Sequence, residues 1–156
     1  MRKVFWSYLL ELAEQDNKII ILIDDLGYGY YEKYKEKLPN QIINVGITEQ
    51  TMIGVAAGLA RNGMKPYCYG TIPFVLMRPY EQVRDDIAYP NLNVKIVGYS
   101  MPGFLGFAHN LEGTENEEDL LKNLPNIKRY YPATEKELKE AMVESYNLKT
   151  PSYIHL

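Results

Sequence analysis

Short apolar runs alternate along this chain with segments in which apolar residues recur at helical spacing. The first run, Lys18–Asp24, is continuous and mostly β-branched, which is typical of a strand buried on both faces of a parallel sheet. The pattern therefore predicts six strands, because five similar runs follow at Gln41–Val45, Lys65–Tyr69, Asn93–Tyr99, Ile127–Tyr131 and Pro151–Leu156.

The segments between these runs predict helices. An amphipathic helix is expected around Val4, Phe5, Tyr8, Leu9 and Leu12, followed by a short polar helix over Tyr30–Leu38. Thr48–Arg61 is apolar almost all round, as in a covered helix, and Pro79–Ala88 begins with a proline suited to a first turn. Thr114–Glu117 and Thr134–Glu137 match the capping box, so helices should begin there.

Strands that alternate with helices indicate one α/β domain over residues 1–156. We expect a three-layer α/β/α fold with a mostly parallel six-stranded sheet. Ligands of such sheets bind beyond the carboxyl ends of the strands. This rule directs attention to five loops, Asp24–Gly29, Gly46–Glu49, Gly70–Arg78, Ser100–Glu115 and Pro132–Thr134.

Composition narrows the class of protein. A net charge of −3 and a pI near 5.5 argue against a nucleic-acid surface, which needs a basic patch. The single Cys68 fits a reducing compartment, and no segment reads as a membrane span or signal peptide, so we expect a cytoplasmic protein. The chain has 14 tyrosines, many of which are expected at the surface or at an interface.

Glu49 is the first candidate for chemistry, because it precedes an apolar run in which no basic residue occurs before Arg61. An unpaired buried carboxylate is costly unless it takes up a proton. A first-turn acid that complements the helix dipole is the simpler alternative. Gly54 and Gly58 favour close packing against this helix, which suggests that its start is enclosed.

The stretch NVGITEQTMIGVAAGLARNGMKPY (Asn44–Tyr67) resembles the pyrimidine-binding domain of the transketolase family, which deoxyxylulose-phosphate synthases share. The resemblance continues through Thr71–Gly98 and Glu117–Leu138 to Pro151–Leu156. It implies the thiamin diphosphate-binding fold, with the cofactor bound between two domains and Glu49 hydrogen-bonded to ring nitrogen N1′ of its aminopyrimidine. A carboxyl with a raised pKa would share its proton with N1′ and so promote ylide formation.

The resemblance also assigns Asp25, which matches the family's Asp-Leu element, to the thiazolium side of the cofactor, whereas we expect Asp24 to be a solvated loop acid. An acidic pair at a strand end also occurs in phosphoacceptor receiver domains. Such a domain needs an aspartate after the third strand and a lysine after the fifth, but this sequence has Tyr69–Thr71 and Tyr130–Pro132 there. The receiver alternative is therefore disfavoured.

The family stacks a phenylalanine on the aminopyrimidine, and here that position falls on Val75, with Phe74 beside it and Ile72 at another usually aromatic place. Either Phe74 or Val75 is expected to contact the ring. Arg78 belongs to the same group of cofactor positions, although for Arg78, Tyr80 and Gln82 we favour a role in holding the helix and a subunit interface. The usual substrate histidine is missing before Glu117–Leu120, and His109 is the candidate to replace it.

No Gly-Asp-Gly followed by Asn, the family's element for Mg²⁺ and diphosphate, occurs in this sequence. The resemblance therefore implies a split transferase in which a separate chain carries the diphosphate-binding domain with Mg²⁺, as a homodimer or heterotetramer. The reaction would move a two-carbon ketol unit between sugars. The alternatives are a non-catalytic assembly or regulatory subunit, and a decarboxylating condensation of the deoxyxylulose type. We expect no metal ligands in this chain, and a partner that covers exposed tyrosines and the apolar loop Tyr69–Met77.

Overall fold

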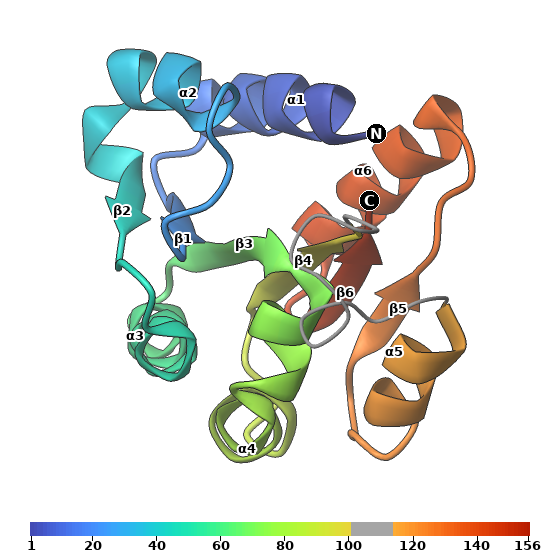
Figure 1. Ribbon diagram of the computed structural model, residues 1–156. Helices are drawn as coiled ribbons and strands as arrows, with labels where there is room; N and C mark the ends of the chain where they lie inside the picture. The colour runs from blue at the N-terminus through green and yellow to red at the C-terminus, as the bar shows by residue number, and fades with distance from the viewer. Residues whose placement is uncertain (101–113) are drawn as a thin grey trace.

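A single parallel sheet runs through the centre of the molecule (Figure 1). The structure, a computed structural model, describes residues 1–100 and 114–156, with backbone alone for 114–116, so His109 and most of Ser100–Glu115 lie outside the described residues. Within these ranges the six strands have the order β2-β1-β3-β4-β6-β5, and every pairing is parallel, as predicted. The strands are β1 (Ile19–Ile23), β2 (Ile42–Asn44), β3 (Lys65–Thr71), β4 (Lys95–Tyr99), β5 (Lys128–Tyr130) and β6 (Ser152–His155).

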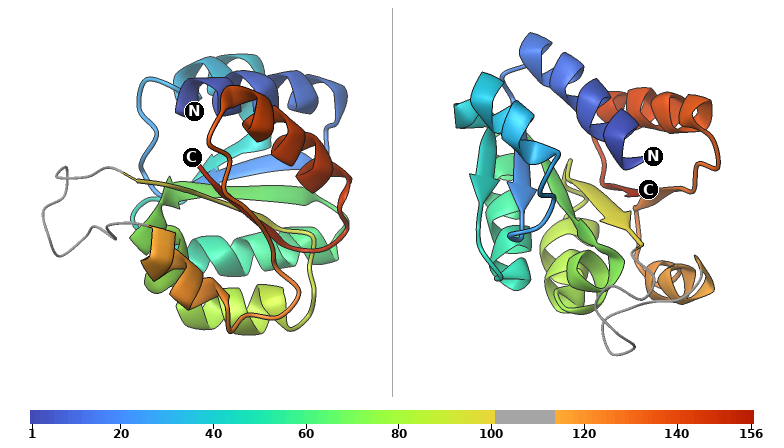
Figure 2. Two further views of the ribbon diagram at one scale, coloured as in Figure 1. Left: turned by 90° about the vertical axis from the view of Figure 1, so that its right-hand side faces the viewer. Right: turned by 45° about the horizontal axis from the view of Figure 1, so that its top comes forward.

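Helices cover both faces of the sheet, which gives the expected three layers (Figure 2). One layer contains α1 (Arg2–Gln15), α2 (Tyr31–Lys37) and α6 (Glu135–Asn147). The other contains α3 (Glu49–Arg61), α4 (Tyr80–Gln82) and α5 (Thr114–Leu121). The predicted helix Pro79–Ala88 is α4 continued by the π-helical segment η3 (Val83–Ala88), and two further short turns are η1 (Pro39–Gln41) and η2 (Pro73–Met77).

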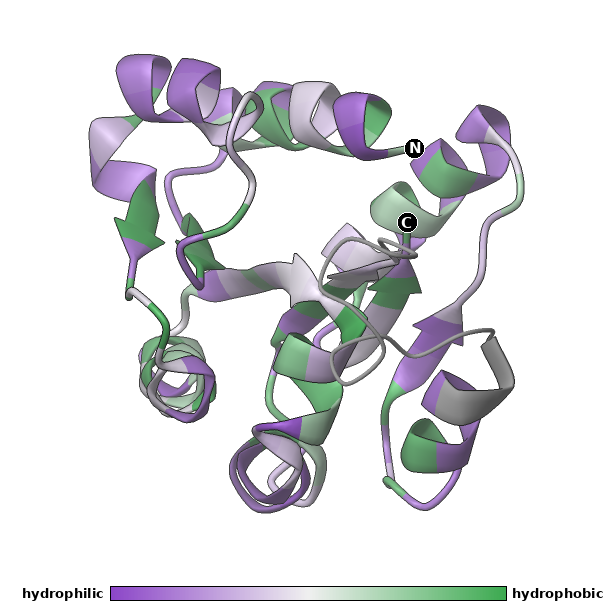
Figure 3. Cartoon of the chain, viewed as in Figure 1, coloured by the Kyte–Doolittle hydropathy of each residue, from purple (hydrophilic) through white to green (hydrophobic). Residues whose placement is uncertain are grey.

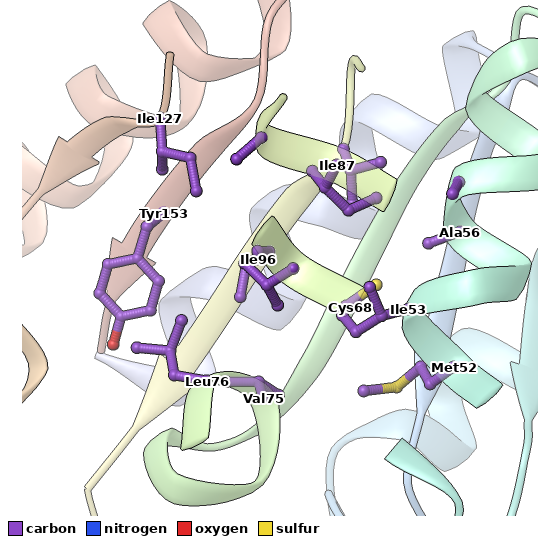
Figure 4. Close-up of a cluster of buried hydrophobic side chains, with 14 of the residues drawn as sticks. Met52, Ile53, Ala56, Cys68, Val75, Leu76, Ile87, Ile96, Ile127 and Tyr153 are labelled. Atoms are coloured by element: carbon purple, nitrogen blue, oxygen red, sulfur yellow. The ribbon is translucent and has the colours of Figure 1, made fainter. Parts of the chain in front are cut away.

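The continuous apolar strands divide their side chains between two cores. Along β1, Ile20 and Leu22 face the layer of α3, whereas Ile19, Ile21 and Ile23 face α1 and α6, because successive strand residues point to opposite faces. Figure 4 shows the first core, in which α3, η2 and η3 pack on β3, β4 and β6. Polar residues dominate the outer helix α2, whereas β1 and β2 are hydrophobic (Figure 3).

More tyrosines are buried in the core than the sequence led us to expect. Tyr28, Tyr89 and Tyr131 are exposed, but six of the fourteen tyrosines are buried, at positions 34, 67, 69, 99, 130 and 153. The ring of Tyr69 stacks on Phe5 and Tyr99 with centroids 5.7 and 5.0 Å apart. These rings fill the space beneath α1, so the abundance of tyrosine reflects core packing as well as surface.

The capping box predicted before α6 is present. The backbone N–H of Glu137 donates to the hydroxyl of Thr134 over 3.2 Å, and the Glu137 carboxylate accepts from the Thr134 N–H over 3.3 Å. These bonds satisfy amide groups that the first helical turn cannot.

Replacement of Thr134 by alanine should lower the free energy of unfolding by about 1 kcal/mol, because one end of the box is lost. Urea unfolding followed by circular dichroism measures this change. Thr51→Ala, at an exposed position within α3, is the matched control and should have little effect. An equal loss in both variants would contradict the capping role.

Candidate functional site

Charged side chains from three separate loops gather beyond the carboxyl ends of β1, β2 and β3. Asp24 follows β1, Glu49 begins the helix after β2, and Arg78 follows the turn η2 after β3. Arg78 pairs directly with Glu49, and the charges of both residues act on Asp24. This edge is the place where parallel sheets bind ligands, so we take the cluster as the candidate site.

Glu49 is buried at the start of α3, with 3% of its surface exposed. Gly46 adopts a positive φ of 72°, which turns the chain sharply between β2 and α3. The hydroxyl of Thr48 donates to the Val45 carbonyl and does not cap the helix. The enclosure expected for Glu49 is therefore present, and it arises from tertiary packing at this turn.

The carboxylate of Glu49 has a partner that the sequence did not reveal. Nη1 of Arg78 donates to Oε1 of Glu49 over 2.5 Å, although the two residues are 29 positions apart. The absence of a basic residue between Glu49 and Arg61 therefore does not leave the carboxylate unpaired, because its partner comes from a distant part of the chain. A buried carboxylate requires such a partner or a proton.

Phe74 lies beside this ion pair. The guanidinium carbon of Arg78 is 4.2 Å from the centroid of the Phe74 ring, which is half-buried on η2. Val75 and Ile72, the other two candidates, are fully buried in the core with 0% and 1% exposure. Figure 4 shows Val75 among the core side chains next to Leu76. Among the three, only Phe74 is partly accessible, and its ring meets Arg78, the ion-pair partner of Glu49. The segment Tyr69–Met77 is largely core instead of an exposed apolar loop.

A cavity of about 340 Å³ opens against this cluster. It is lined by the turn before α3, the first turn of that helix and the arginine, namely Ile47, Thr48, Glu49, Gln50, Thr51 and Arg78. Its walls combine one buried carboxylate with small polar and apolar groups. Such a lining suits a flat polar ring that presents N–H donors.

Asp24 is buried, with 2% of its surface exposed, so the expectation of a solvated loop acid is wrong. Burial raises its pKa to about 7, the charge of Glu49 acts in the same direction, and that of Arg78 opposes it. Neither carboxylate oxygen has a hydrogen-bond partner within the part of the chain that the structure describes. The space comes from Gly70, where a Cβ would lie 2.5 Å from Oδ2 of Asp24.

The side chain of Asp25 bonds to residues other than Glu49 and Arg78 and joins the ends of β1 and β2. Its carboxylate accepts from Nδ2 of Asn44 over 3.0 Å and from the Tyr28 hydroxyl over 2.9 Å, and these bonds lower its pKa. Oδ1 of Asn44 accepts from the backbone N–H groups of Asp25 and Gly46. Asn44 therefore fixes the turn that leads to Glu49. It is not among the residues predicted above, although an Asn at a strand end near a glycine is a turn signal.

Among residues 1–100 and 114–156 nothing packs against Gly54 or Gly58, contrary to expectation. Both lie on the exposed side of α3, and a Cβ at either position would meet no atom within 4 Å. Val55 and Ile47 are exposed on the same part of the molecule, by 37% and 73%. The face of α3 formed by Gly54, Val55 and Gly58 therefore carries only small side chains, and no element among the described residues covers it.

The described residues support neither a metal site nor a membrane-spanning helix. Residues 1–100 and 114–156 contain no group of three or more His, Cys, Asp or Glu side chains placed to hold a metal ion. None of the helices found there is long and apolar enough to cross a membrane.

The fold and site together define an α/β domain with a buried glutamate at the carboxyl edge of a parallel sheet. The family model "Transketolase, pyrimidine binding domain" matches residues 1–156, and the chain therefore belongs to this family. The resemblance read from the residues is confirmed.

Curated relatives agree with this assignment. The chain is 33% identical over 158 residues to the 6-deoxy-6-sulfo-D-fructose transketolase subunit SqwH of Clostridium sp. (strain MSTE9), covering 100% of this chain and 49% of that protein. It is 32% identical to an apulose-4-phosphate transketolase subunit of Phocaeicola vulgatus, covering 99% of this chain and 50% of the relative. A 1-deoxy-D-xylulose-5-phosphate synthase of Bacillus cereus is 36% identical over 132 residues, which are 83% of this chain and 20% of that enzyme.

Solved structures show the same fold. A split gene transketolase described as an inactive beta4 tetramer superposes with a TM-score of 0.86 at 31% identity, over 99% of this chain and 50% of that chain. The transketolase of Campylobacter jejuni has a TM-score of 0.79 at 19% identity, over 99% of this chain and 25% of that chain, a likeness of fold. The present chain spans about half the length of the transketolase subunits that it matches.

The raised pKa of Asp24 predicts how stability changes with pH. The folded chain holds the Asp24 proton up to about pH 7, whereas the unfolded chain holds it only up to about pH 3.8. The protonated Asp24 carboxyl therefore contributes its full stabilisation of the folded chain below pH 3.8, and this stabilisation is lost as the pH rises through 7. Asp24→Asn should therefore be more stable than the parent chain at pH 8, and the difference should shrink toward pH 4. Urea unfolding across this pH range measures it.

Asp25→Asn is the control, since Asp25 is partly exposed and its pKa is shifted downward. That substitution should not increase stability at high pH. A pH dependence that Asp24→Asn leaves unchanged would show that Asp24 does not hold its proton in the folded chain.

Proposed function

We propose that this chain is the pyrimidine-binding half of a split, thiamine diphosphate-dependent transketolase-type enzyme, and that Glu49 contacts ring nitrogen N1′ of the cofactor's aminopyrimidine. The observation that carries the proposal is the buried Glu49 carboxylate at the carboxyl edge of the sheet, paired with Arg78, whose guanidinium lies over the half-buried Phe74 ring. The relatives named as subunits of transketolases support the split arrangement.

The residues present fit an aminopyrimidine. Arg78 places a planar cationic group over the Phe74 ring at 4.2 Å and donates an N–H bond to Glu49 over 2.5 Å. This part of the site thus accepts a flat group that both stacks and donates a hydrogen bond. The aminopyrimidine is also planar, and its protonated N1′ can donate a hydrogen bond.

When bound, thiamine diphosphate supplies a nucleophilic carbon that takes up and passes on a two-carbon unit. Glu49 would hold or release the proton at N1′ through Oε1, and its burial strengthens that hydrogen bond. Phe74 would orient the ring by stacking, which contributes about 0.5–1.5 kcal/mol beyond burial. We assign Mg²⁺ and the diphosphate to the partner chain's domain.

We further propose that the partner chain covers the exposed face of α3. Gly54 and Gly58 leave this face open, and small residues allow another backbone to approach closely. The same side of α3 carries the exposed Thr51, which lines the cavity at Glu49, so a chain that docks there would reach the site. A tetramer is the assembly named for one structural relative, and a homodimer or heterotetramer is the form we propose here.

Replacement of Gly58 by leucine tests this interface. The helix itself should gain about 0.8–1 kcal/mol, because glycine is a poor helix former and the new side chain enters open space. Assembly with the partner chain should nevertheless weaken strongly. Size-exclusion chromatography with light scattering on the co-purified complex measures it, and Val143→Leu on the exposed side of α6 is the control. Unchanged assembly by Gly58→Leu would rule out this docking face.

The proposed reaction is transfer of a ketol unit between sugars in the cytoplasm, where a single buried cysteine is compatible with reducing conditions. A decarboxylating condensation is the second candidate, because a deoxyxylulose-phosphate synthase is as similar to this chain as the transketolase subunits are. Product analysis with ketose phosphates and with pyruvate plus an aldehyde acceptor separates the two reactions.

Glu49→Gln should reduce turnover by the reconstituted complex at least about a hundredfold, because proton exchange at N1′ loses its carboxylate. The assay uses this chain, its co-purified partner, Mg²⁺ and thiamine diphosphate. Glu81→Gln, an exposed carboxylate on α4, is the matched control and should keep the parent rate.

Parent-like turnover in Glu49→Gln would overturn the assignment. Isothermal titration of thiamine diphosphate into the complex tests the remaining alternative, a non-catalytic subunit. Saturable binding that depends on Glu49 excludes that alternative, and absence of binding would establish it.

A further inference from the structure

Arg78 already makes both contacts that the proposed function assigns to the aminopyrimidine. Its guanidinium donates to Oε1 of Glu49 over 2.5 Å and lies over the ring of Phe74 at 4.2 Å. Glu49 and Phe74 are the two groups that would bind and stack the cofactor ring. A guanidinium is planar, cationic and rich in N–H donors, so it reproduces the features by which this site would recognise the pyrimidine.

Two groups cannot occupy the same face of one phenyl ring and the same carboxylate oxygen. The ring of Phe74 is half-buried, which limits how much of it a ligand can reach, and Glu49 is 3% exposed. The cavity of about 340 Å³ at this place is lined by Arg78 itself. Glu49 lines it too, so a ring that enters from this cavity meets the carboxylate with the arginine already bound to it.

We infer that Arg78 is a built-in competitor that holds the pyrimidine site of the free chain and must swing away from Glu49 before the cofactor ring can bind. This inference rests on the proposed function, since it assumes that Glu49 and Phe74 receive the aminopyrimidine.

The backbone allows this movement without refolding. The N–H of Arg78 is fixed by the Pro73 carbonyl at 3.0 Å, at the end of η2, so the main chain stays in place. The side chain is 38% exposed, which leaves room for it to rotate toward solvent. Glu49 would exchange one N–H donor for another and would not be left as an unpaired buried charge. The arginine thus stabilises the folded chain, and the need to displace it weakens cofactor binding.

Titration of thiamine, which carries the aminopyrimidine without the diphosphate, tests the inference on this chain directly. Arg78→Met removes the guanidinium but keeps a long side chain, and we expect it to bind thiamine about tenfold or more tightly than the parent chain does. Its stability to urea at neutral pH should fall, because Glu49 loses its ionic partner. Arg84→Met, which removes an exposed arginine paired with Asp85 on η3, is the matched control and should change neither quantity.

A second measurement uses the unmodified chain, so the test stands even where Arg78→Met is poorly folded. Nuclear magnetic resonance of the arginine Nε–H groups should show one signal that moves toward the position of a solvent-exposed guanidinium as thiamine is added. Assignment comes from Arg78→Lys, which retains the charge but lacks the planar group.

The outcomes separate the two ideas. The competitor role is overturned if the parent chain binds thiamine as tightly as Arg78→Met or more tightly and the guanidinium signal does not move. The proposed function then remains intact. Failure of thiamine to bind any variant, combined with full turnover by Glu49→Gln in the complex, overturns the proposed function and the inference together.

Discussion

A buried carboxylate that must keep a partner controls the carboxyl edge of this domain. Glu49 is 3% exposed, and an ionised group at such a place requires an opposite charge, a hydrogen-bond donor or a proton. In this chain the guanidinium of Arg78 meets that requirement at 2.5 Å. The same need makes the position suitable for a ligand, since a ring that donates to Glu49 can replace the arginine while the charge remains compensated.

The sheet explains why these groups meet. Parallel strands place their carboxyl ends at one edge, so the residues after β1, β2 and β3 converge although they are far apart in sequence. Asn44 and Asp25 tie the ends of β1 and β2 together, and Gly46 turns the chain into α3. The lack of a side chain at Gly70 leaves space for the Asp24 carboxyl. The site is therefore supported by the architecture and by small local features of the loops.

The outer surface of α3 shows that this domain has an uncovered side. Gly54 and Gly58 would be poor choices for a solvated helix, because each weakens it relative to alanine. In the proposed assembly they allow close approach by another backbone, and no described residue of this chain approaches them. The chain also matches about half the length of the transketolase subunits to which it is similar. The uncovered face is the surface that we propose the partner chain covers.

The sequence alone determined the six strands, their parallel arrangement, the capping box at Thr134 and the position of Glu49 at the mouth of a helix. These features follow from local periodicity and capping chemistry, which neighbouring residues specify. Only the tertiary structure decided that Arg78 pairs with Glu49, that Phe74 is partly accessible and Val75 is not, that Asp24 is buried, and that Gly54 and Gly58 face outward. Each of these depends on how separate loops come together at the sheet edge, because burial and ion pairing are set by residues distant in the chain.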